Sequence, residues 1–579
     1  MGGVVLRVDM SSLDIRVGGV PRACSGLAGR GLTSAMVAAE VPAGCHPLGR
    51  HNKLVIAPGA LSGTEAPNSG RLSIGLKSPL TGGIKESNVG GTAAYRLGRL
   101  GLAAIVIEGL PHEERPYLLV VTKDGGRLIS CSAYRGLKNY ELVKALHTAY
   151  GEKAAILSVG PAGEMMLPVA TVACTDTAGL PCRHAGRGGT GAVMGAKGLK
   201  AIIIDDADGP GVTIADAEKF RQGAKRLAKA LRDHPLTGQA LRLLGTNLFA
   251  GAIDAAGAYP TRNFRRGTFE GIDRVSGEYM YEVITRRGGK PSRAGCSLCT
   301  IECSNVYLDE QGGYITSALE YGTIWAHGAN LDISDLDSIA KADRLCDDYG
   351  IDTLEIGQAI GVAMEAGIKQ FGDAPGALEL IEEVGRGTSL GKILGNGAWA
   401  TGRAFGATRI PCVKRQAMAA YDPRAIHGMG VTYATSPMGA DHTAGWVVHT
   451  NLVSMGGTLD PHNPDGQVDN CRRVQVFTAA MDCTGLCNFT HLPIVGTDEG
   501  KESFLSMMNG LYGKEFAFED IMTLGKELLE TEHGFNLAAG FTRADDRLPE
   551  FMKEETLPPH NVKFTVPDDE LDRFWGEFR

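Results

Sequence analysis

Four cysteines constrain this chain more than any other feature of its sequence. Cys296, Cys299 and Cys303 follow one another at spacings of three and four residues, and Cys487 lies far downstream. Four thiolates in this pattern can hold a 4Fe–4S cluster, which the spacing slightly favours, or a structural zinc ion. For either metal group, the chain must fold so that a segment near residue 300 meets one near residue 487.

Length and composition limit the class of protein. At 579 residues the chain exceeds the ~250–300 residues at which one hydrophobic core stops growing, so we expect two or three domains. The content of 43% hydrophobic and 21% charged residues is that of an ordinary globular protein. A net charge of −8 gives no footprint for nucleic acid.

The sequence also predicts where the protein resides. No run reaches the ~18 apolar residues of a membrane span, and the first residues lack the apolar core of a signal peptide. We therefore expect a cytoplasmic protein that binds neither membrane nor nucleic acid. In that compartment thirteen cysteines indicate ligands rather than disulfides.

The pattern of apolar residues predicts an α+β fold. The first 207 residues are rich in short strands punctuated by glycine, and later segments have helical periodicity. The expected elements of the first part are a hairpin of residues 4–8 and 14–17, a half-buried strand at 71–76, a hairpin around the turn at 123–126, and a helix at 140–150. Helices are expected later at 217–231, 338–369, 474–481 and 520–532, and the tail after residue 548 is expected to wrap the surface. We predict a β-rich domain at 1–207 and mainly helical domains at 208–410 and 411–579.

One short pattern occurs twice. Residues 347–352 and 482–487 both read Asp-x-x-Gly followed by an aliphatic residue, and both follow a helical segment. Two unrelated glycine caps would explain the repeat. Alternatively, an aspartate held at a loop end can accept two parallel hydrogen bonds from an amine and a ring N–H, as on the edge of a pterin. Because the second loop includes Cys487, it would then contact both a pterin and the metal–sulfur site.

With these motifs the chain resembles the aldehyde ferredoxin oxidoreductase family of tungsten bis-pterin enzymes. The resemblance covers nearly the whole length. It rests on the cysteine pattern, on both Asp-x-x-Gly loops, and on segments 29–32, 67–71, 77–83, 87–91, 160–164, 185–197, 260–264, 320–321 and 421–424. It implies a β-rich first domain that forms a base for two pterins, with two helical domains closing over it.

The resemblance also implies the residues that hold the cofactors. In the first domain these are Arg71, Asn88, Gly90, Arg183, Ala185 and Arg187. On the helical side they are Asp347, Ile351, Asp352, Asp482, Leu486 and Asn488. Cys296, Cys299, Cys303 and Cys487 would bind one 4Fe–4S cluster. Tungsten, or less favoured molybdenum, would be held by the two pterins without a protein ligand, and a Mg²⁺ ion bridging the pterin phosphates is a further candidate. His184 stands where the family commonly has a small residue and is expected to alter contacts to one pterin.

Three residues are candidates for catalysis through the same resemblance. Glu320 matches the family's active-site glutamate and would activate water or the hydrated aldehyde. A buried or salt-bridged structural glutamate is the alternative. His442 would donate a hydrogen bond or a proton near the metal, although a lone histidine is more often structural. Tyr321, beside Glu320, is the third candidate.

The implied reaction is oxidation of an aldehyde to a carboxylic acid, with electrons passing through the cluster to ferredoxin or a ferredoxin-like subunit. One alternative is a low-potential reductase subunit of a larger complex, similar to relatives that act on aryl-CoA thioesters. Another is a non-catalytic iron–sulfur electron-transfer protein. The archetype's subunit-bridging metal uses a histidine in the second domain, but this chain has none between His327 and His427. A homodimer and a hetero-oligomer therefore both stay open.

Overall fold

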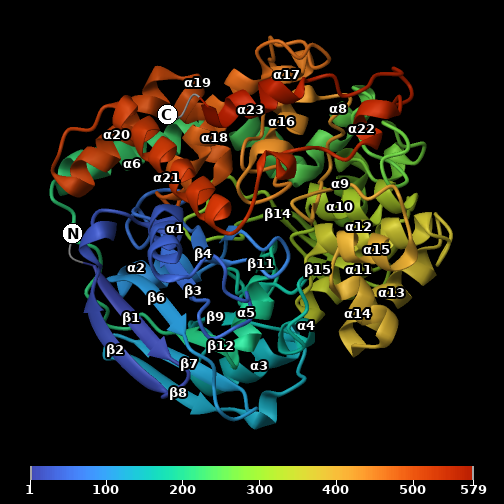
Figure 1. The fold of residues 1–579 in the computed structure, drawn as a ribbon. Coiled ribbons are helices and arrows are strands. Elements are labelled where there is room, and N and C mark those ends of the chain that lie inside the picture. Colours follow the sequence, from blue (N-terminus) through green and yellow to red (C-terminus); the bar gives the residue numbers. More distant parts are fainter. Residues whose placement is uncertain (1–2, 577–579) are drawn as a thin grey trace.

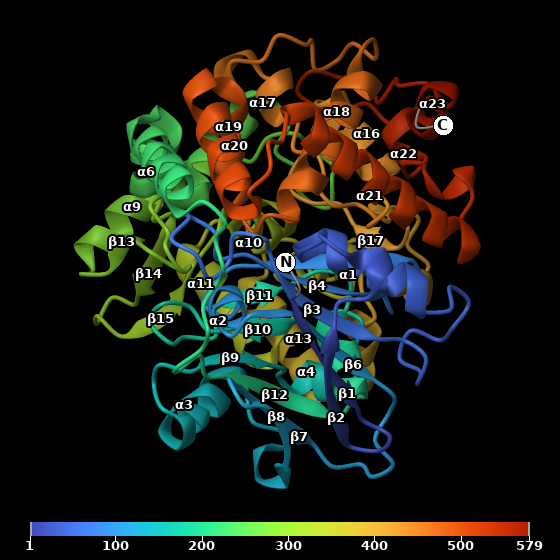
Figure 2. The same cartoon turned by 90° about the vertical axis from the view of Figure 1, so that its left-hand side faces the viewer.

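The computed structural model, which describes residues 3–576, has an α+β fold (Figure 1). Two mixed sheets form the first part of the chain, in the lower half of the view, and the remainder is mostly helical. A second view shows the helices of the last third lying above the sheets (Figure 2). The predicted fold class is confirmed. The change from sheet to helix falls between Ile204 and Ala217, whereas the division near residue 410 remains a prediction.

The first sheet has six strands in the order β2-β1-β6-β3-β4-β5. Its strands are Val4–Asp9 (β1), Asp14–Gly19 (β2), Leu54–Pro58 (β3), Leu72–Lys77 (β4), Ile84–Val89 (β5) and Leu102–Glu108 (β6). β1 and β6 run parallel and the other neighbours are antiparallel. The predicted first hairpin is confirmed, since Val8 of β1 pairs with Ile15 of β2.

The second sheet also has six strands, in the order β11-β10-β9-β12-β7-β8. Its strands are Tyr117–Thr122 (β7), Gly125–Ser130 (β8), Ala155–Ser158 (β9), Val172–Cys174 (β10), Arg183–Ala185 (β11) and Leu199–Ile204 (β12). β7 and β8 form the second predicted hairpin. The helices of the first part are Gly29–Glu40 (α1), Ala93–Arg99 (α2), Asn139–Tyr150 (α3), Pro161–Glu164 (α4) and Thr190–Ala196 (α5).

The first part of the chain has four layers, which pack through side chains on alternate faces of the two sheets. Leu6 and Val8 of the first sheet share one core with Leu119 of the second sheet. The intervening residues point the other way, so Val5 packs with α1, and Leu118 of the second sheet packs with α3. Because side chains in a strand alternate between faces, each sheet has a core on both sides. The order of the layers is therefore α1, first sheet, second sheet, α3.

This layering corrects the expectation for residues 71–76. The strand there, β4, is buried along its whole length rather than on one face. Leu72 and Ile74 point into the core between the sheets, and Gly75 on the opposite face lies against Thr33 of α1. A helix covering the second face is a tertiary feature that the alternation of β4 does not encode.

The second part is built from helices around one continuous hydrophobic core. Its helices are Ala217–Asp233 (α6), Leu241–Leu244 (α7), Phe249–Ala255 (α8), Gly277–Arg286 (α9), Tyr321–His327 (α10), Leu336–Tyr349 (α11), Thr353–Glu365 (α12), Ala374–Arg386 (α13), Ser389–Gly395 (α14), Ala398–Phe405 (α15), His427–Thr435 (α16), Val448–Asn451 (α17), Gln467–Asp482 (α18), His491–Gly496 (α19), Asp498–Tyr512 (α20), Phe518–Ala538 (α21), Phe551–Glu554 (α22) and Asp568–Gly576 (α23). Its strands are Lys290–Arg293 (β13), Ser304–Leu308 (β14), Tyr314–Ser317 (β15), Cys412–Val413 (β16) and Gln416–Ala417 (β17).

The C-terminal tail differs from its prediction. It contains α22 and α23, and it buries Phe551, Phe564 and Leu571 in the core of the helical part. The tail is therefore anchored by apolar side chains that are too widely spaced to give a periodic signal. Among residues 3–576, no helix combines the length and apolarity needed to cross a bilayer.

Candidate active site between the sheets and the helices

Both Asp-x-x-Gly loops end a helix and then dock on the sheet part. Gly350 follows α11 with φ +70° and Gly485 follows α18 with φ +80°, a conformation that favours glycine. From the first loop, the carbonyl of Gly350 accepts a hydrogen bond from the Thr171 N–H at 2.9 Å. From the second, the carbonyl of Gly485 accepts one from the Arg71 N–H at 3.1 Å. The two loops therefore share a tertiary role, which two unrelated caps would not require.

Glycines on the sheet side permit this docking. A Cβ on Gly160 would lie 2.3 Å from the carbonyl oxygen of Tyr349, and one on Gly59 would lie 2.0 Å from the backbone nitrogen of Gly485. Both distances are far below contact, so any larger residue would push a loop away. The close approach holds the first loop against the second sheet and the second loop against the first sheet.

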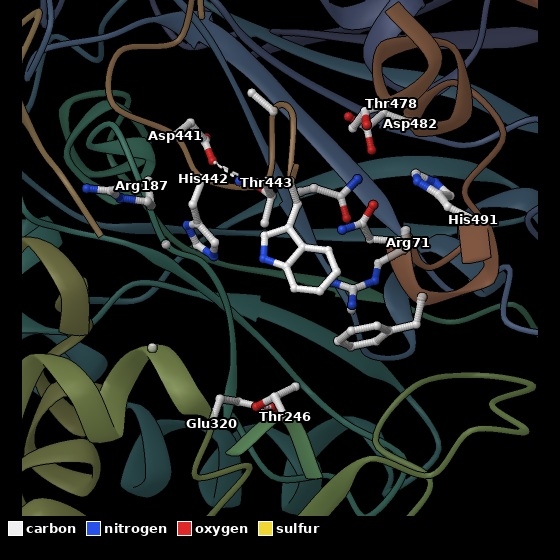
Figure 3. Close-up of a pocket in the computed structure, with 18 of the residues that line it drawn as sticks. Arg71, Arg187, Thr246, Glu320, Asp441, His442, Thr443, Thr478, Asp482 and His491 are labelled. Atoms are coloured by element: carbon white, nitrogen blue, oxygen red, sulfur yellow. Dashed lines mark hydrogen bonds between the residues drawn. The ribbon is translucent and has the colours of Figure 1, made fainter. Parts of the chain in front are cut away.

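The docked loops enclose a cavity of about 980 Å³ between the two parts of the molecule (Figure 3). Every predicted pterin and catalytic residue except Ala185 lines it: Arg71, Asn88, Gly90, Arg183, Arg187, Glu320, Tyr321, Asp347, Ile351, Asp352, His442, Asp482, Leu486 and Asn488. Ala185 is fully buried in β11, where its carbonyl accepts a hydrogen bond from Thr190. The cavity therefore brings together residues from positions 71 to 488.

One asparagine joins the two cysteine segments next to the cavity. The backbone N–H of Asn68 donates to the carbonyl of Leu298 at 2.9 Å, and its carbonyl accepts from the N–H of Cys487 at 2.9 Å. Its amide nitrogen lies 4.0 Å from the Cys299 sulfur. Cys296 is near too, since a Cβ on Gly90 would lie 2.5 Å from its sulfur.

The four cysteines are gathered without converging on a point. Among residues 3–576, no three His, Cys, Asp or Glu side chains are arranged to hold a single metal ion. The choice between a 4Fe–4S cluster and a structural zinc ion stays a prediction. The cysteine loop also reaches the surface, because Leu298, between Cys296 and Cys299, is 42% exposed.

Arginines supply positive charge to the cavity wall. Arg30 pairs with Asp482 at 3.1 Å and with Glu532 at 2.8 Å, and all three are largely shielded from water. Arg187 donates to the carbonyls of Ala440 and Ala417 at 2.7 and 2.6 Å. Arg71 and Arg183 line the same cavity, and guanidinium groups are the side chains that bind phosphate oxygens in a bidentate manner.

Glu320 is the residue before α10, and its carboxylate is held by two partners. Arg183 Nη1 lies 3.0 Å from Oε1, and Thr246 donates its hydroxyl to Oε2 at 2.6 Å. The side chain keeps 28% of its surface exposed, toward the cavity. Glu320 is thus salt-bridged, as its structural alternative required, and at the same time open to a bound molecule.

The other two candidate catalytic residues differ in what they offer. His442 presents a buried Nδ1 without a hydrogen-bond partner, and burial lowers the pKa of the imidazole to about 4. It is therefore neutral near pH 7. Tyr321 donates its hydroxyl to the carbonyl of Ala420 at 2.8 Å, and burial raises its pKa well above its ordinary value. Its ring lines the cavity but its hydroxyl is already engaged.

Burial also shifts the carboxyl groups of the two loops. It raises the pKa of Asp347, although His184 lies 3.0 Å from this carboxylate and opposes the shift. It raises the pKa of Asp482 to about 6 despite the ion pair with Arg30. Glu86, on β5, reaches a pKa of about 8 for the same reason. His184 thus contacts one loop carboxylate directly, while its effect on contacts to a pterin stays a prediction.

Several cavity residues were missed by sequence reasoning. His491 lies four residues after Cys487, a spacing that could have drawn attention, and its buried Nε2 has no hydrogen-bond partner. Figure 3 places it beside Asp482, away from Glu320. Five aromatic residues of the lining were also missed, and they come from separate segments with no common motif: Phe249, Trp446, Phe477, Phe489 and Phe518.

The chemistry of this donor set fits the cofactors that the sequence implied. Arg71 Nε, Arg183 Nε and Glu86 Oε1 are buried at the cavity without hydrogen-bond partners. Buried polar atoms of that kind are usually satisfied, so a polar ligand is the natural partner. The guanidinium groups suit phosphates, the loop aspartates suit ring N–H donors, and the gathered cysteines suit a cluster.

Comparisons with known proteins show the family of the chain. The family model described as the N-terminal domain of aldehyde ferredoxin oxidoreductase matches residues 5–206, and that for domains 2 and 3 matches residues 222–578. The tungsten-containing aldehyde ferredoxin oxidoreductase of Thermococcus kodakarensis is 35% identical, covering 96% of this chain and 92% of the relative. That of Pyrococcus furiosus is 34% identical with the same coverage.

More distant proteins share the architecture. A WOR-like subunit of an aliphatic sulfonate oxidoreductase from Pyrococcus furiosus is 25% identical over 90% of this chain and 84% of its own length. The solved active-site complex BamBC of benzoyl coenzyme A reductase superposes with a TM-score of 0.79 at 18% identity, covering 100% of this chain and 93% of that one. The latter likeness concerns the fold alone.

The family matches identify the chain as an oxidoreductase. Within that class, the chain belongs to the aldehyde ferredoxin oxidoreductase family.

Proposed function

We propose that this protein oxidises aldehydes to carboxylic acids with a tungsten bis-pterin and passes the electrons through a 4Fe–4S cluster to ferredoxin. One observation carries the proposal: the loop that contributes Asp482 to the cavity also contributes Cys487 to the cysteine site. A cofactor on that aspartate would lie next to a group on that cysteine. Relatives named as tungsten-containing enzymes at 34–35% identity support the choice of metal.

The residues that would hold the cofactors follow from the cavity. Arg71, Arg183 and Arg187 would bind the pterin phosphates, while Asp347 and Asp482 would accept hydrogen bonds from the pterin rings. A Mg²⁺ ion between the phosphates is part of this proposal. When bound, the tungsten bis-pterin would supply a centre that accepts two electrons, and the cluster would pass them on singly.

Side chains of this protein would transfer the protons of the reaction. Conversion of an aldehyde and water into an acid releases two electrons and two protons. Glu320, oriented by Thr246 and Arg183, would take a proton from water or from the hydrated aldehyde. Neutral His442 would donate a hydrogen bond to the substrate oxygen. Tyr321 would shape the wall, because its hydroxyl is engaged by Ala420.

An electron acceptor would approach the cysteine loop. Leu298 brings that loop to the surface, which supports transfer to a separate small protein such as ferredoxin or a ferredoxin-like subunit. The choice between homodimer and hetero-oligomer, like the cytoplasmic location, is left as a prediction.

Anaerobically purified protein would test the proposal. We expect one tungsten and four iron atoms per chain, and reduction of a viologen dye when an aldehyde is added. Absence of dye reduction with every aldehyde tried, in protein of full metal content, would reject the reaction. Molybdenum in place of tungsten would change the metal but not the chemistry.

A second candidate is reduction of an aryl-CoA thioester as a subunit of a larger complex. The fold likeness to the benzoyl coenzyme A reductase complex and the aromatic residues of the cavity favour it. Adding benzoyl-CoA to the dye-reduced protein separates the two, since only this second reaction would reoxidise the dye. Membership of an oxidoreductase family disfavours a non-catalytic electron-transfer role.

A further inference from the structure

Part of the cavity lining consists of residues that are not proposed to hold a cofactor. It includes five aromatic side chains, Phe249, Trp446, Phe477, Phe489 and Phe518, which we together name the aromatic branch. These residues come from α8, from the loop before α17, and from segments on and after α18. None of them is among the residues proposed to bind pterin. These side chains are therefore available to contact another molecule.

Rings on one side of the branch form a first group. The ring centroids of Phe249 and Trp446 lie 5.2 Å apart, and Trp446 stacks on His449 at 5.6 Å with an interplanar angle of 27°. Phe249 is buried and Trp446 is half-buried. Contacts of this kind fix the rings in place, so the wall is already shaped before a guest arrives.

A second group of rings completes the branch. Phe477 meets His491 edge-on at 5.1 Å and stacks on Phe518 at 5.8 Å. Lys501 Nζ lies 4.5 Å above the ring of Phe518. The same stretch of lining includes Val495, which is 53% exposed, so this end of the cavity reaches the surface. A molecule entering there would pass between ring faces and edges.

The histidines of the branch add little charge. Burial lowers the pKa of His491 to about 3, and it also lowers that of His449. Both imidazoles are thus neutral near pH 7. The rings of the lining favour a flat guest, because an aromatic ring can make offset or edge contacts with several ring neighbours at once. A short aliphatic chain would leave these faces without a partner.

We propose that the aromatic branch is the substrate pocket and that it selects aldehydes carrying an aromatic ring over short aliphatic ones. This inference rests on the proposed aldehyde oxidation, which places the carbonyl end of the substrate near Glu320 and His442. The ring would then occupy the aromatic branch while the carbonyl faces the reacting residues.

Steady-state oxidation with a viologen acceptor gives the first test. Two ring contacts are expected to make kcat/KM for benzaldehyde roughly tenfold or more above that for acetaldehyde. Replacing Phe477 by Leu keeps an apolar side chain and removes the ring. Phe477→Leu should lower kcat/KM for benzaldehyde roughly threefold to tenfold and leave that for acetaldehyde nearly unchanged. Phe477→Tyr, which restores a ring, should recover most of the loss.

A matched control distinguishes an effect on the substrate pocket from a general effect of removing a buried ring. Phe504 is a fully buried phenylalanine on α20 that does not line the cavity. Phe504→Leu should leave the benzaldehyde-to-acetaldehyde ratio unchanged, even if it lowers stability. If Phe477→Leu should fold poorly, the half-buried Trp446 offers a second variant, Trp446→Leu, with the same expected change of ratio.

Binding gives a readout that does not depend on turnover. Calorimetric titration of the anaerobically purified protein with benzoate should give saturable heat, whereas acetate at the same concentrations should not. Benzoate binding that is weakened by Phe477→Leu but not by Phe504→Leu would support the pocket even if no aldehyde were oxidised, the result that rejects the proposed function. Equal use of acetaldehyde, equal effects of both substitutions, or turnover of benzoyl-CoA alone would overturn the inference.

Discussion

Arg71 donates a hydrogen bond to the sulfur of Cys487, with Nη2 3.6 Å from Sγ. Arg71 precedes β4 of the first sheet, and Cys487 lies in the second Asp-x-x-Gly loop, 416 residues later. The contact therefore connects the cavity wall directly to the cysteine site. A positive charge this close to a thiolate favours the more reduced, more negative state of any cluster bound there.

The first prediction concerns this contact. Arg71→Gln should lower the reduction potential of the cluster, because it removes the charge that stabilises the reduced state. A redox titration followed by electron paramagnetic resonance measures the midpoint. Arg16→Gln, at an exposed site on β2, is the matched control and should have the parent potential. An unchanged midpoint in Arg71→Gln with normal iron content would contradict the proposed cluster position.

Removal of the candidate base should abolish most turnover. Glu320→Gln keeps one oxygen that can accept a hydrogen bond from Arg183 or Thr246, but the amide cannot take up a proton. We expect kcat to fall about 10²- to 10⁴-fold, with tungsten and iron content near that of the parent. The exposed Glu282→Gln on α9 is the control. Full activity in Glu320→Gln would leave only its structural role.

The two loop aspartates should determine cofactor content. Asp347→Ala and Asp482→Ala each remove a carboxylate from the cavity wall, so the pterin and tungsten per chain should fall in both. Fluorescence of the oxidised pterin and elemental analysis measure the loss. Asp465→Ala, at an exposed position before α18, should retain full content. If both variants retain both pterins, the two loops act only as helix caps and do not bind pterin.

The cysteine set should be testable by colour. Cys299→Ser and Cys487→Ser should lose the broad visible absorption of a cluster and most of the bound iron. Cys412→Ser, a half-buried cysteine on β16 away from this loop, should keep both. A colourless parent protein that contains zinc would instead support the structural-metal alternative.

Protein produced without cofactors should lose stability as the pH rises. Burial, followed by the nearby Asp482, raises the pKa of Glu86 from an ordinary 4.5 to about 8. Between these values the folded state keeps a proton that the unfolded state has released, so the free energy of unfolding falls as pH increases, by a few kcal/mol at most. Glu86→Gln should therefore raise the melting temperature at pH 8 more than at pH 5.

A control sharpens that measurement. The exposed Glu282→Gln should change the melting temperature equally little at both pH values. Asp482 titrates in the lower part of the same range, so some pH dependence should persist in Glu86→Gln. Identical pH dependence in Glu86→Gln and the parent protein would show that Glu86 is not the titrating group.

The sequence by itself determined the class of fold, the two hairpins and the candidate site, because each of these features depends on residues that are close together in the sequence. Period-two alternation predicts strands, glycine ends helices, and cysteine spacing marks a metal–sulfur site. The family resemblance added which arginines and aspartates to expect together. All but one of the predicted pterin and catalytic residues line a single cavity.

Only the tertiary structure decided the rest. Burial of β4 on both faces depends on α1 and on the second sheet, and the anchoring of the tail depends on a core built by distant helices. The ion pair of Glu320 with Arg183 and the five rings of the aromatic branch join segments that are far apart in the chain. Local sequence cannot encode such contacts, because their energy comes from side chains that meet only when the whole molecule has packed.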